Sequence, residues 1–169
     1  MKEFLLSAAI CLAVVSISAQ ENQSDRESQP AMKQLEFMVG EWKGTGWMMG
    51  RDGNRHHFDQ TEKVEYKLDN TVILVEGLGK TDGVVTHNAL AIISYNKAVQ
   101  NYSFHSYLSS GLENTFTGEM KEGAFTWYMN ENMRYVLRIN EEGQWDEKGE
   151  MNRGGQWFQF MEMKLDRVD

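Results

Sequence analysis

Turn signals recur at regular intervals along most of the chain, and this regularity limits the fold more than any other feature of the sequence. Nine short pairs mark the turns: Asp52-Gly53, Asp69-Asn70, Asp82-Gly83, Asn96-Lys97, Ser110-Gly111, Glu122-Gly123, Glu131-Asn132, Glu142-Gly143 and Gly154-Gly155. The segments between them have the length and composition of β-strands. The ten predicted strands are roughly residues 41–49, 55–68, 71–79, 84–95, 100–108, 112–120, 124–130, 133–140, 144–152 and 156–166.

The connections between these strands are too short for crossover helices, so neighbouring strands must run antiparallel. Ten antiparallel strands with one apolar face each close most economically into a barrel. The predicted fold is therefore all-β, an antiparallel up-and-down β-barrel of about ten strands. An amphipathic run over residues 32–39 leads into the first strand, and we expect it to form a short N-terminal helix that plugs one end. Gly44 and Gly46 on the first strand predict a sharp bend or a close approach of another group.

The first residues have the pattern of a processing signal. Lys2 precedes an apolar run over residues 4–17, which is too short to span a bilayer, and small residues follow it. We expect residues 1–19 to be a signal peptide and the protein to be secreted or periplasmic. Residues 20–30 are polar and predict a disordered tether, and residues 31–169 form the predicted barrel domain.

The net charge of −8 and the absence of a basic cluster argue against nucleic acid and anionic membranes as partners. The sequence has no second long apolar segment, so no membrane span is expected. Its one cysteine, Cys11, lies in the predicted signal peptide. With no other cysteine and no suitably spaced histidines, no metal site is expected.

Residues 55–68 show the alternation of a half-buried strand. The odd-numbered positions are all polar, whereas the even-numbered positions are His56, Phe58, Gln60, Glu62, Val64, Tyr66 and Leu68. The even-numbered face should point inward. This places Gln60 and Glu62 among apolar side chains, where polar groups need partners or water. The strand therefore predicts a wet or ligand-filled cavity.

Aromatic and methionine side chains dominate the later strands. The inward candidates are Tyr102, Phe104, Phe125, Trp127, Met129, Tyr135, Leu137, Trp145, Met151, Trp157, Met161 and Met163. They could line an adaptable pocket or fill a dry core. We favour the cavity, because a ten-stranded barrel encloses more space than side chains readily fill. On the last strand, Phe158 and Phe160 should lie on the opposite, outer face.

These positions together predict a ligand site with aromatic walls and a few orienting polar groups. The wall residues are Trp47, Phe58, Tyr66, Phe104, Trp127 and Tyr135, and the orienting residues are Gln60, Glu62, His87 and Arg134. The expected partner is a small hydrophobic or amphipathic molecule. Two alternatives stay open: Glu62 could pair with Arg134 or Arg138, and His87 could simply be a hydrogen-bonded strand residue. The pattern leaves open whether His87 or its neighbour Asn88 faces the cavity, because residues 84–95 are apolar on both faces.

The short helical lead, Gly40-x-Trp42 on the first strand and Arg167 after the last strand resemble the lipocalin-like, or calycin, superfamily. That resemblance implies a barrel floor closed by Gly40 and Trp42, with Arg167 packed across the tryptophan ring. The sequence more closely resembles a secreted bacterial domain-of-unknown-function family, number 1579. The matching pieces are Phe37-Met38-Val39-Gly40-Glu41-Trp42-Lys43-Gly44, His87-Asn88-Ala89-Leu90-Ala91, Ser94-Tyr95, Phe125-Thr126-Trp127, Met133-Arg134-Tyr135, Trp145-Asp146-Glu147-x-Gly149 and the run from Trp157 to Arg167.

More distantly, the sequence resembles the nitrobindin haem barrels, whose first strand carries repeating glycines as at Gly40, Gly44 and Gly46, and the fatty-acid-binding barrels. Nitrobindins hold haem through a histidine late in the chain, whereas no histidine follows His105 here. We therefore expect no cofactor, with haem as the lesser alternative. The short gap over residues 50–54 has no room for the helical lid of the fatty-acid-binding branch.

Two other functional classes remain open on the same scaffold. An enzyme could use Glu62 or His87 as an acid–base group. An interaction or inhibitor module, or a homodimer, could use exposed Trp47, Phe158 and Phe160.

Overall fold

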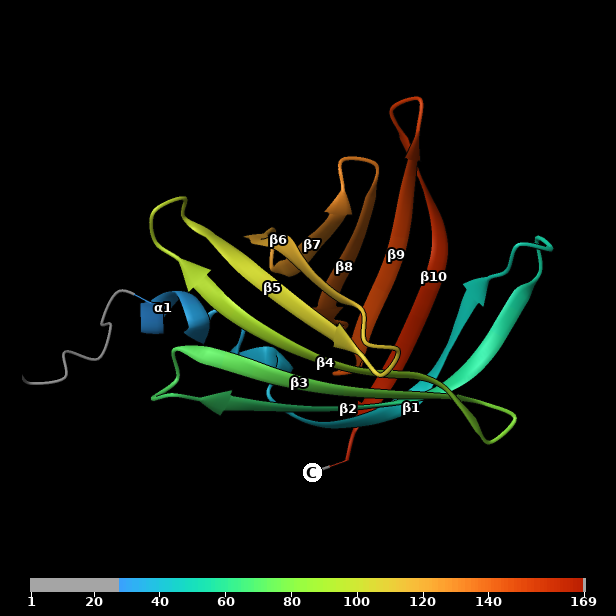
Figure 1. The fold of residues 1–169 in the computed structure, drawn as a ribbon, viewed down its shortest axis with the longest axis horizontal. Helices are drawn as coiled ribbons and strands as arrows, with labels where there is room; N and C mark the ends of the chain where they lie inside the picture. The colour runs from blue at the N-terminus through green and yellow to red at the C-terminus, as the bar shows by residue number, and fades with distance from the viewer. Residues whose placement is uncertain (1–27, 169) are drawn as a thin grey trace, which may run out of the picture.

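Ten antiparallel strands follow one another around a closed barrel in the computed structural model, which describes residues 28–168 (Figure 1). Each strand pairs with the next along the chain, and β1 pairs with β10 to close the sheet. The strands are β1 (Gly40–Met49), β2 (Arg55–Lys67), β3 (Val72–Thr81), β4 (Val84–Asn96), β5 (Asn101–Leu108), β6 (Glu113–Lys121), β7 (Ala124–Asn130), β8 (Met133–Ile139), β9 (Trp145–Arg153) and β10 (Gln156–Arg167). The predicted all-β, ten-stranded antiparallel barrel is confirmed. The predicted signal peptide and most of the predicted tether lie outside the described residues.

The turn chemistry explains why the strand boundaries were predictable. Asp82 and Gly83 both have positive φ, 51° and 77°, and Glu122 and Gly123 repeat the same pair of values. Two successive residues with positive φ form the tight hairpin turn whose twist matches that of the flanking strands. Glycine adopts this conformation without steric cost, so the glycine of each pair marks the turn in the sequence.

The N-terminal segment packs against the barrel through buried side chains and backbone carbonyls. It consists of α1 (Ser28–Lys33) and the short helix η1 (Glu36–Met38). Met32, Leu35 and Met38 are buried in the core. The hydroxyl of Tyr102 donates to the carbonyl of Ala31 (2.7 Å), and the hydroxyl of Tyr66 donates to that of Met32 (3.1 Å). The helical structure thus begins before the predicted residues 32–39 and takes in residues 28–30 of the predicted tether.

Trp42 and Arg167 meet where β1 and β10 pair. The guanidinium carbon of Arg167 lies 4.6 Å from the centre of the buried Trp42 ring. Its Nη2 donates to the carbonyl of Val39 (2.6 Å), and the Trp42 indole donates to the carbonyl of Met38 (2.8 Å). Gly40 begins β1 with a φ of 136°, which a side chain would strain. The tryptophan–arginine contact implied by the resemblance is present.

Replacing Arg167 by alanine is expected to lower the free energy of unfolding by about 1 kcal/mol, because it removes an exposed cation–π contact and a charge-assisted hydrogen bond. Chemical denaturation monitored by tryptophan fluorescence measures this difference. Lys164→Ala, at another exposed position of the same strand, is the matched control and should have almost no effect. An equal decrease in the free energy of unfolding for the two variants would show that the contact with Trp42 does not contribute to stability.

A β-bulge in β10 changes the alternation of inward and outward side chains. In β10 the register shifts between Gln159 and Met161, which turns Phe160 inward against Tyr135, with ring centres 5.7 Å apart. Trp157 is outward, beneath the guanidinium of Arg134 (4.1 Å). The predictions of an inward Trp157 and an outward Phe160 are therefore wrong, because strict alternation does not survive a bulge.

Trp47 is also less accessible than the sequence suggests. The residue is only 9% exposed. The centre of its ring lies 3.8 Å from the guanidinium carbon of Arg55, and its indole N–H donates a hydrogen bond to Glu162 (3.2 Å). Of the three aromatic residues expected to form an interaction surface, Phe158 alone is strongly exposed.

Candidate functional site

One half of the barrel is packed and the other half is hollow. Met32, Leu35 and Met38 of the N-terminal segment belong to one buried core with Trp42 and residues of the strands. Beyond them lies a cavity of about 490 Å³. Its floor is formed by the buried Met38, Phe125, Leu137 and Met163. Exposed residues surround its mouth, namely Met48, His56, Thr86, Asn114 and Met129.

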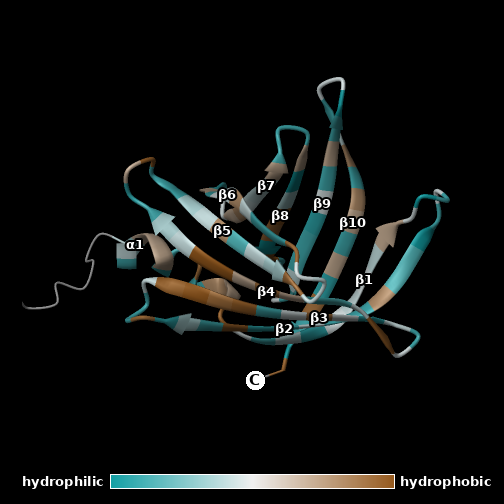
Figure 2. Cartoon of the chain, in the orientation of Figure 1, coloured by the Kyte–Doolittle hydropathy of each residue, from teal (hydrophilic) through white to brown (hydrophobic). Residues whose placement is uncertain are grey.

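The strands contribute unequally to this cup. Apolar residues concentrate along β3 and β4, whereas β2 is largely hydrophilic (Figure 2). Nevertheless β2 lines the cavity through its even-numbered positions, while Asp59, Thr61 and Lys63 are exposed. The predicted inward face of β2, including Gln60 and Glu62, is confirmed.

Glu62 is buried at the side of the cavity and is held by its neighbour two residues earlier. The amide of Gln60 donates to Glu62 Oε1 (2.6 Å). Gly77 lies opposite on β3, where a Cβ atom would come within 2.9 Å of both carboxyl oxygens, so the glycine makes room for the carboxyl group. Burial raises the pKa of Glu62 to about 8, although the Gln60 hydrogen bond opposes this and the charge of Glu147 adds to it.

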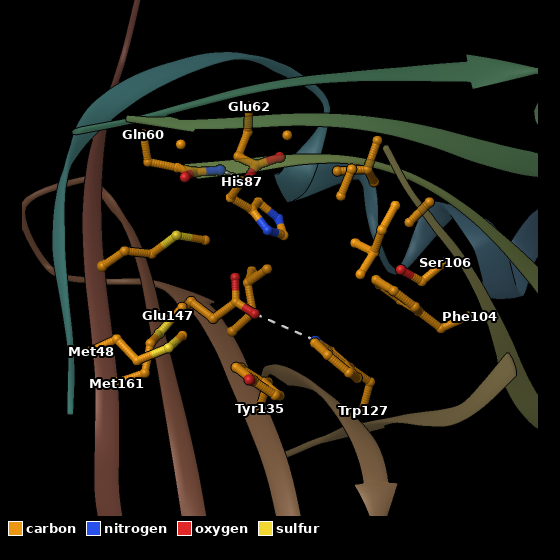
Figure 3. A pocket seen from close by; sticks show the side chains of 18 of the residues that line it. Met48, Gln60, Glu62, His87, Phe104, Ser106, Trp127, Tyr135, Glu147 and Met161 are labelled. Atoms are coloured by element: carbon orange, nitrogen blue, oxygen red, sulfur yellow. Dashed lines mark hydrogen bonds between the residues drawn. The ribbon is translucent and has the colours of Figure 1, made fainter. Parts of the chain in front are cut away.

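Glu147 is a second buried carboxyl group, and the sequence reasoning missed it. The indole nitrogen of Trp145 donates to one of its oxygens (3.1 Å) and that of Trp127 to the other (3.3 Å; Figure 3). Burial raises its pKa to about 7, and the two indole hydrogen bonds oppose the rise. The signal was available: Glu147 lies between Trp145 and Met151 on the face predicted to point inward.

His87 reaches the cavity by regular alternation, because it lies on the same face of β4 as Ala89 and Ala91, which also line the cavity. Gly79 pairs with His87 but the next residue, Lys80, pairs with Val85, so Thr86 is an extra residue in the strand. This bulge adds Thr86 to the cavity lining beside His87. His87 is exposed to solvent, but the protein around its ring still removes enough water to lower its pKa. The open question of which residue faces inward is thus resolved in favour of His87.

An aromatic wall completes the cavity. The ring of Trp127 stacks between those of Phe104 and Tyr135, with centres 4.7 Å and 4.2 Å away and interplanar angles of 8° and 5°. These residues come from β5, β7 and β8. Burial, with the charge of Glu147 as a smaller contribution, raises the pKa of Tyr135 to about 12, so its hydroxyl stays protonated at neutral pH.

The structure brings together seven of the ten predicted site residues in the cavity lining: Phe58, Gln60, Glu62, His87, Phe104, Trp127 and Tyr135. The other three predicted residues do not line the cavity. They are Trp47, Tyr66 and Arg134, and their contacts outside the cavity are described above. Arg134 forms an ion pair with Glu150 (2.8 Å), and Arg138 is 3.6 Å from Asp146. Neither arginine therefore neutralises Glu62.

Fold and site together define a closed ten-stranded β-barrel with an aromatic internal cavity that contains two carboxyl groups. No family model matches the chain, and no curated protein is significantly similar to it. Over residues 28–168, no helix has the length and apolar character needed to cross a membrane, and no group of three His, Cys, Asp or Glu side chains is arranged to hold a metal ion.

Proposed function

We propose that the protein binds a small, mostly hydrophobic molecule inside its barrel. The observation that carries this proposal is the cavity of about 490 Å³. Protein interiors are close-packed, and their voids rarely exceed the size of a water molecule. Ligand pockets typically measure roughly 300–1,000 Å³ and combine apolar walls with a few polar groups. The cavity matches that description in both size and chemistry.

The arrangement of the lining supports a particular orientation of the ligand. The aromatic wall of Phe104, Trp127 and Tyr135 would contact the apolar body. Glu62 and Glu147 are only 7% and 6% exposed, and they would bind the polar end. Because buried carboxyl groups need hydrogen-bond partners, the site favours a mostly apolar ligand that carries a polar group at one end.

The resemblance to secreted lipocalin-like barrels of family 1579 fits this function, and we propose that the protein belongs to that class. The buried Met32, Leu35 and Met38 support a closing role for the N-terminal segment at one end of the barrel. The sequence pattern of residues 1–19 supports a secreted or periplasmic location, where such a protein would collect or carry its ligand.

Titration with N-phenyl-1-naphthylamine, a neutral hydrophobic dye whose fluorescence rises in apolar surroundings, tests the proposal. We expect saturable binding that Ala89→Trp weakens at least about tenfold, because the indole would occupy the cavity. Asn88→Trp is the matched control: Asn88 precedes Ala89 on the same strand and does not line the cavity. Equal binding by both variants, or no saturable binding by the wild type, would contradict the proposal.

A further inference from the structure

We propose that the ligand is a cationic amphiphile, an organic amine whose ammonium group binds between Glu62 and Glu147 while its apolar body contacts the aromatic wall. This inference rests on the proposed function and adds the chemical class of the ligand. The observations that support it are the charges of the lining, the remaining hydrogen-bonding capacity of the two carboxyl groups, and their depth in the cavity.

The charges of the lining have one sign. Within residues 28–168, no lysine or arginine lines the cavity, although two glutamates do. The other titratable groups of the lining are His56, His87 and Tyr135. His87, with its lowered pKa, is neutral at neutral pH. A ligand with a carboxylate or phosphate end would find no fixed cation here and would face two acidic groups. A ligand with a positive end would find two carboxyl groups that can ionise to neutralise it.

The two carboxyl groups have hydrogen-bonding capacity left. Each carboxylate offers about four acceptor positions. The indoles of Trp127 and Trp145 use one position on each oxygen of Glu147, and among the described residues Gln60 is the donor to Glu62. An ammonium group is a compact donor of three hydrogen bonds with no acceptor. It could therefore bind both carboxyl groups without displacing the existing hydrogen bonds.

The position of the carboxyl groups makes such binding selective. Glu62 and Glu147 come from β2 and β9, and their side chains point toward one another across the cavity, with His87 between the two walls (Figure 3). The charge of Glu147 is close enough to raise the pKa of Glu62. A cation between them relieves this repulsion, so its binding favours the ionised carboxylates and releases protons to solvent.

Three ligands with the same chain and different head groups test the inference: n-octylamine, n-octanol and n-octanoate, each displacing the naphthylamine dye at neutral pH. We expect octylamine to bind at least about tenfold more tightly than octanol, and octanoate to bind most weakly. Octanoate or octanol binding as tightly as octylamine would overturn the inference and leave the proposed function intact. Failure of the dye itself to bind would instead overturn the proposed function.

Charge-removing variants locate the ammonium site. Glu62→Gln and Glu147→Gln should each lower the affinity for octylamine, relative to that for octanol, by at least about tenfold. Glu76→Gln makes the same change of charge at an exposed position of β3 and should alter neither ligand. Unchanged octylamine affinity in both cavity variants would overturn the inference.

A measurement on the wild-type protein covers the case in which a variant does not fold. Calorimetric titration in two buffers of different ionisation enthalpy measures the number of protons released per ligand bound. Octylamine binding should release protons, whereas octanol binding should release none. Octylamine affinity should also rise as the pH increases from about 6 to about 8.5, because the glutamates ionise while the amine stays charged, and His87, whose pKa is lowered, adds no opposing positive charge. Binding without proton release, and with no dependence on pH, would overturn the inference.

Discussion

Raising the pH is expected to destabilise this protein strongly, by up to about 5 kcal/mol from Glu62 alone. The ordinary pKa of a glutamate is 4.5, and burial raises that of Glu62 to about 8. The native state therefore holds a proton that the unfolded state has lost between these two values. Stability from this group is fully present below about pH 4.5 and is lost as the pH rises through about 8. The difference between the two pKa values corresponds to about 5 kcal/mol.

Glu147 adds to the effect in the same direction, because burial raises its pKa to about 7. Urea denaturation at a series of pH values measures how the free energy of unfolding changes with pH. The Glu62→Gln variant keeps the shape of the side chain without a titrating group, so its stability should vary much less with pH. A wild-type stability that stays constant or increases from pH 5 to pH 9 would show that these carboxyl groups are solvated rather than enclosed.

The second large effect is expected at Gly44, where replacement by alanine should lower the free energy of unfolding by about 3 kcal/mol. An added Cβ atom would overlap the backbone carbonyl oxygen of Lys164 and lie 2.8 Å from the Cα of Leu165. Both are backbone atoms of β10, so no change of rotamer can relieve the contact. The strands that close the barrel would have to separate.

Thr45→Ala, at the next and exposed residue of β1, is the matched control and should change stability by less than about 0.5 kcal/mol. Thermal unfolding followed by circular dichroism compares the two variants. A Gly44→Ala protein as stable as the wild type would mean that β1 and β10 approach one another less closely than the barrel requires.

The architecture could be predicted from the sequence because turns and strands are local features. Residues such as Gly83 and Gly123 mark hairpins by their conformational freedom alone. The inward position of Gln60 and Glu62 could be predicted because β2 alternates without interruption. All ten strands therefore begin and end within two residues of the predicted positions.

The candidate site could be predicted only where the alternation continues unbroken. The bulge at Phe160 reverses the outward and inward positions of β10, and the bulge at Thr86 adds that residue to the cavity lining. Neither has a recognisable sequence signal of the kind that glycine gives a turn. The role of Glu147 depends on hydrogen bonds that its carboxyl oxygens accept from indoles on β7 and β9. The alternation of residues along one strand does not reveal contacts with another strand.

The location of a bound hydrophobic molecule tests the central claim most directly. A crystal structure of the wild-type protein with N-phenyl-1-naphthylamine should show the dye inside the barrel, in contact with Phe104, Trp127 and Tyr135 and above the floor formed by Phe125 and Leu137. Dye bound only on the outer surface, or a barrel whose side chains have closed the cavity, would contradict the account.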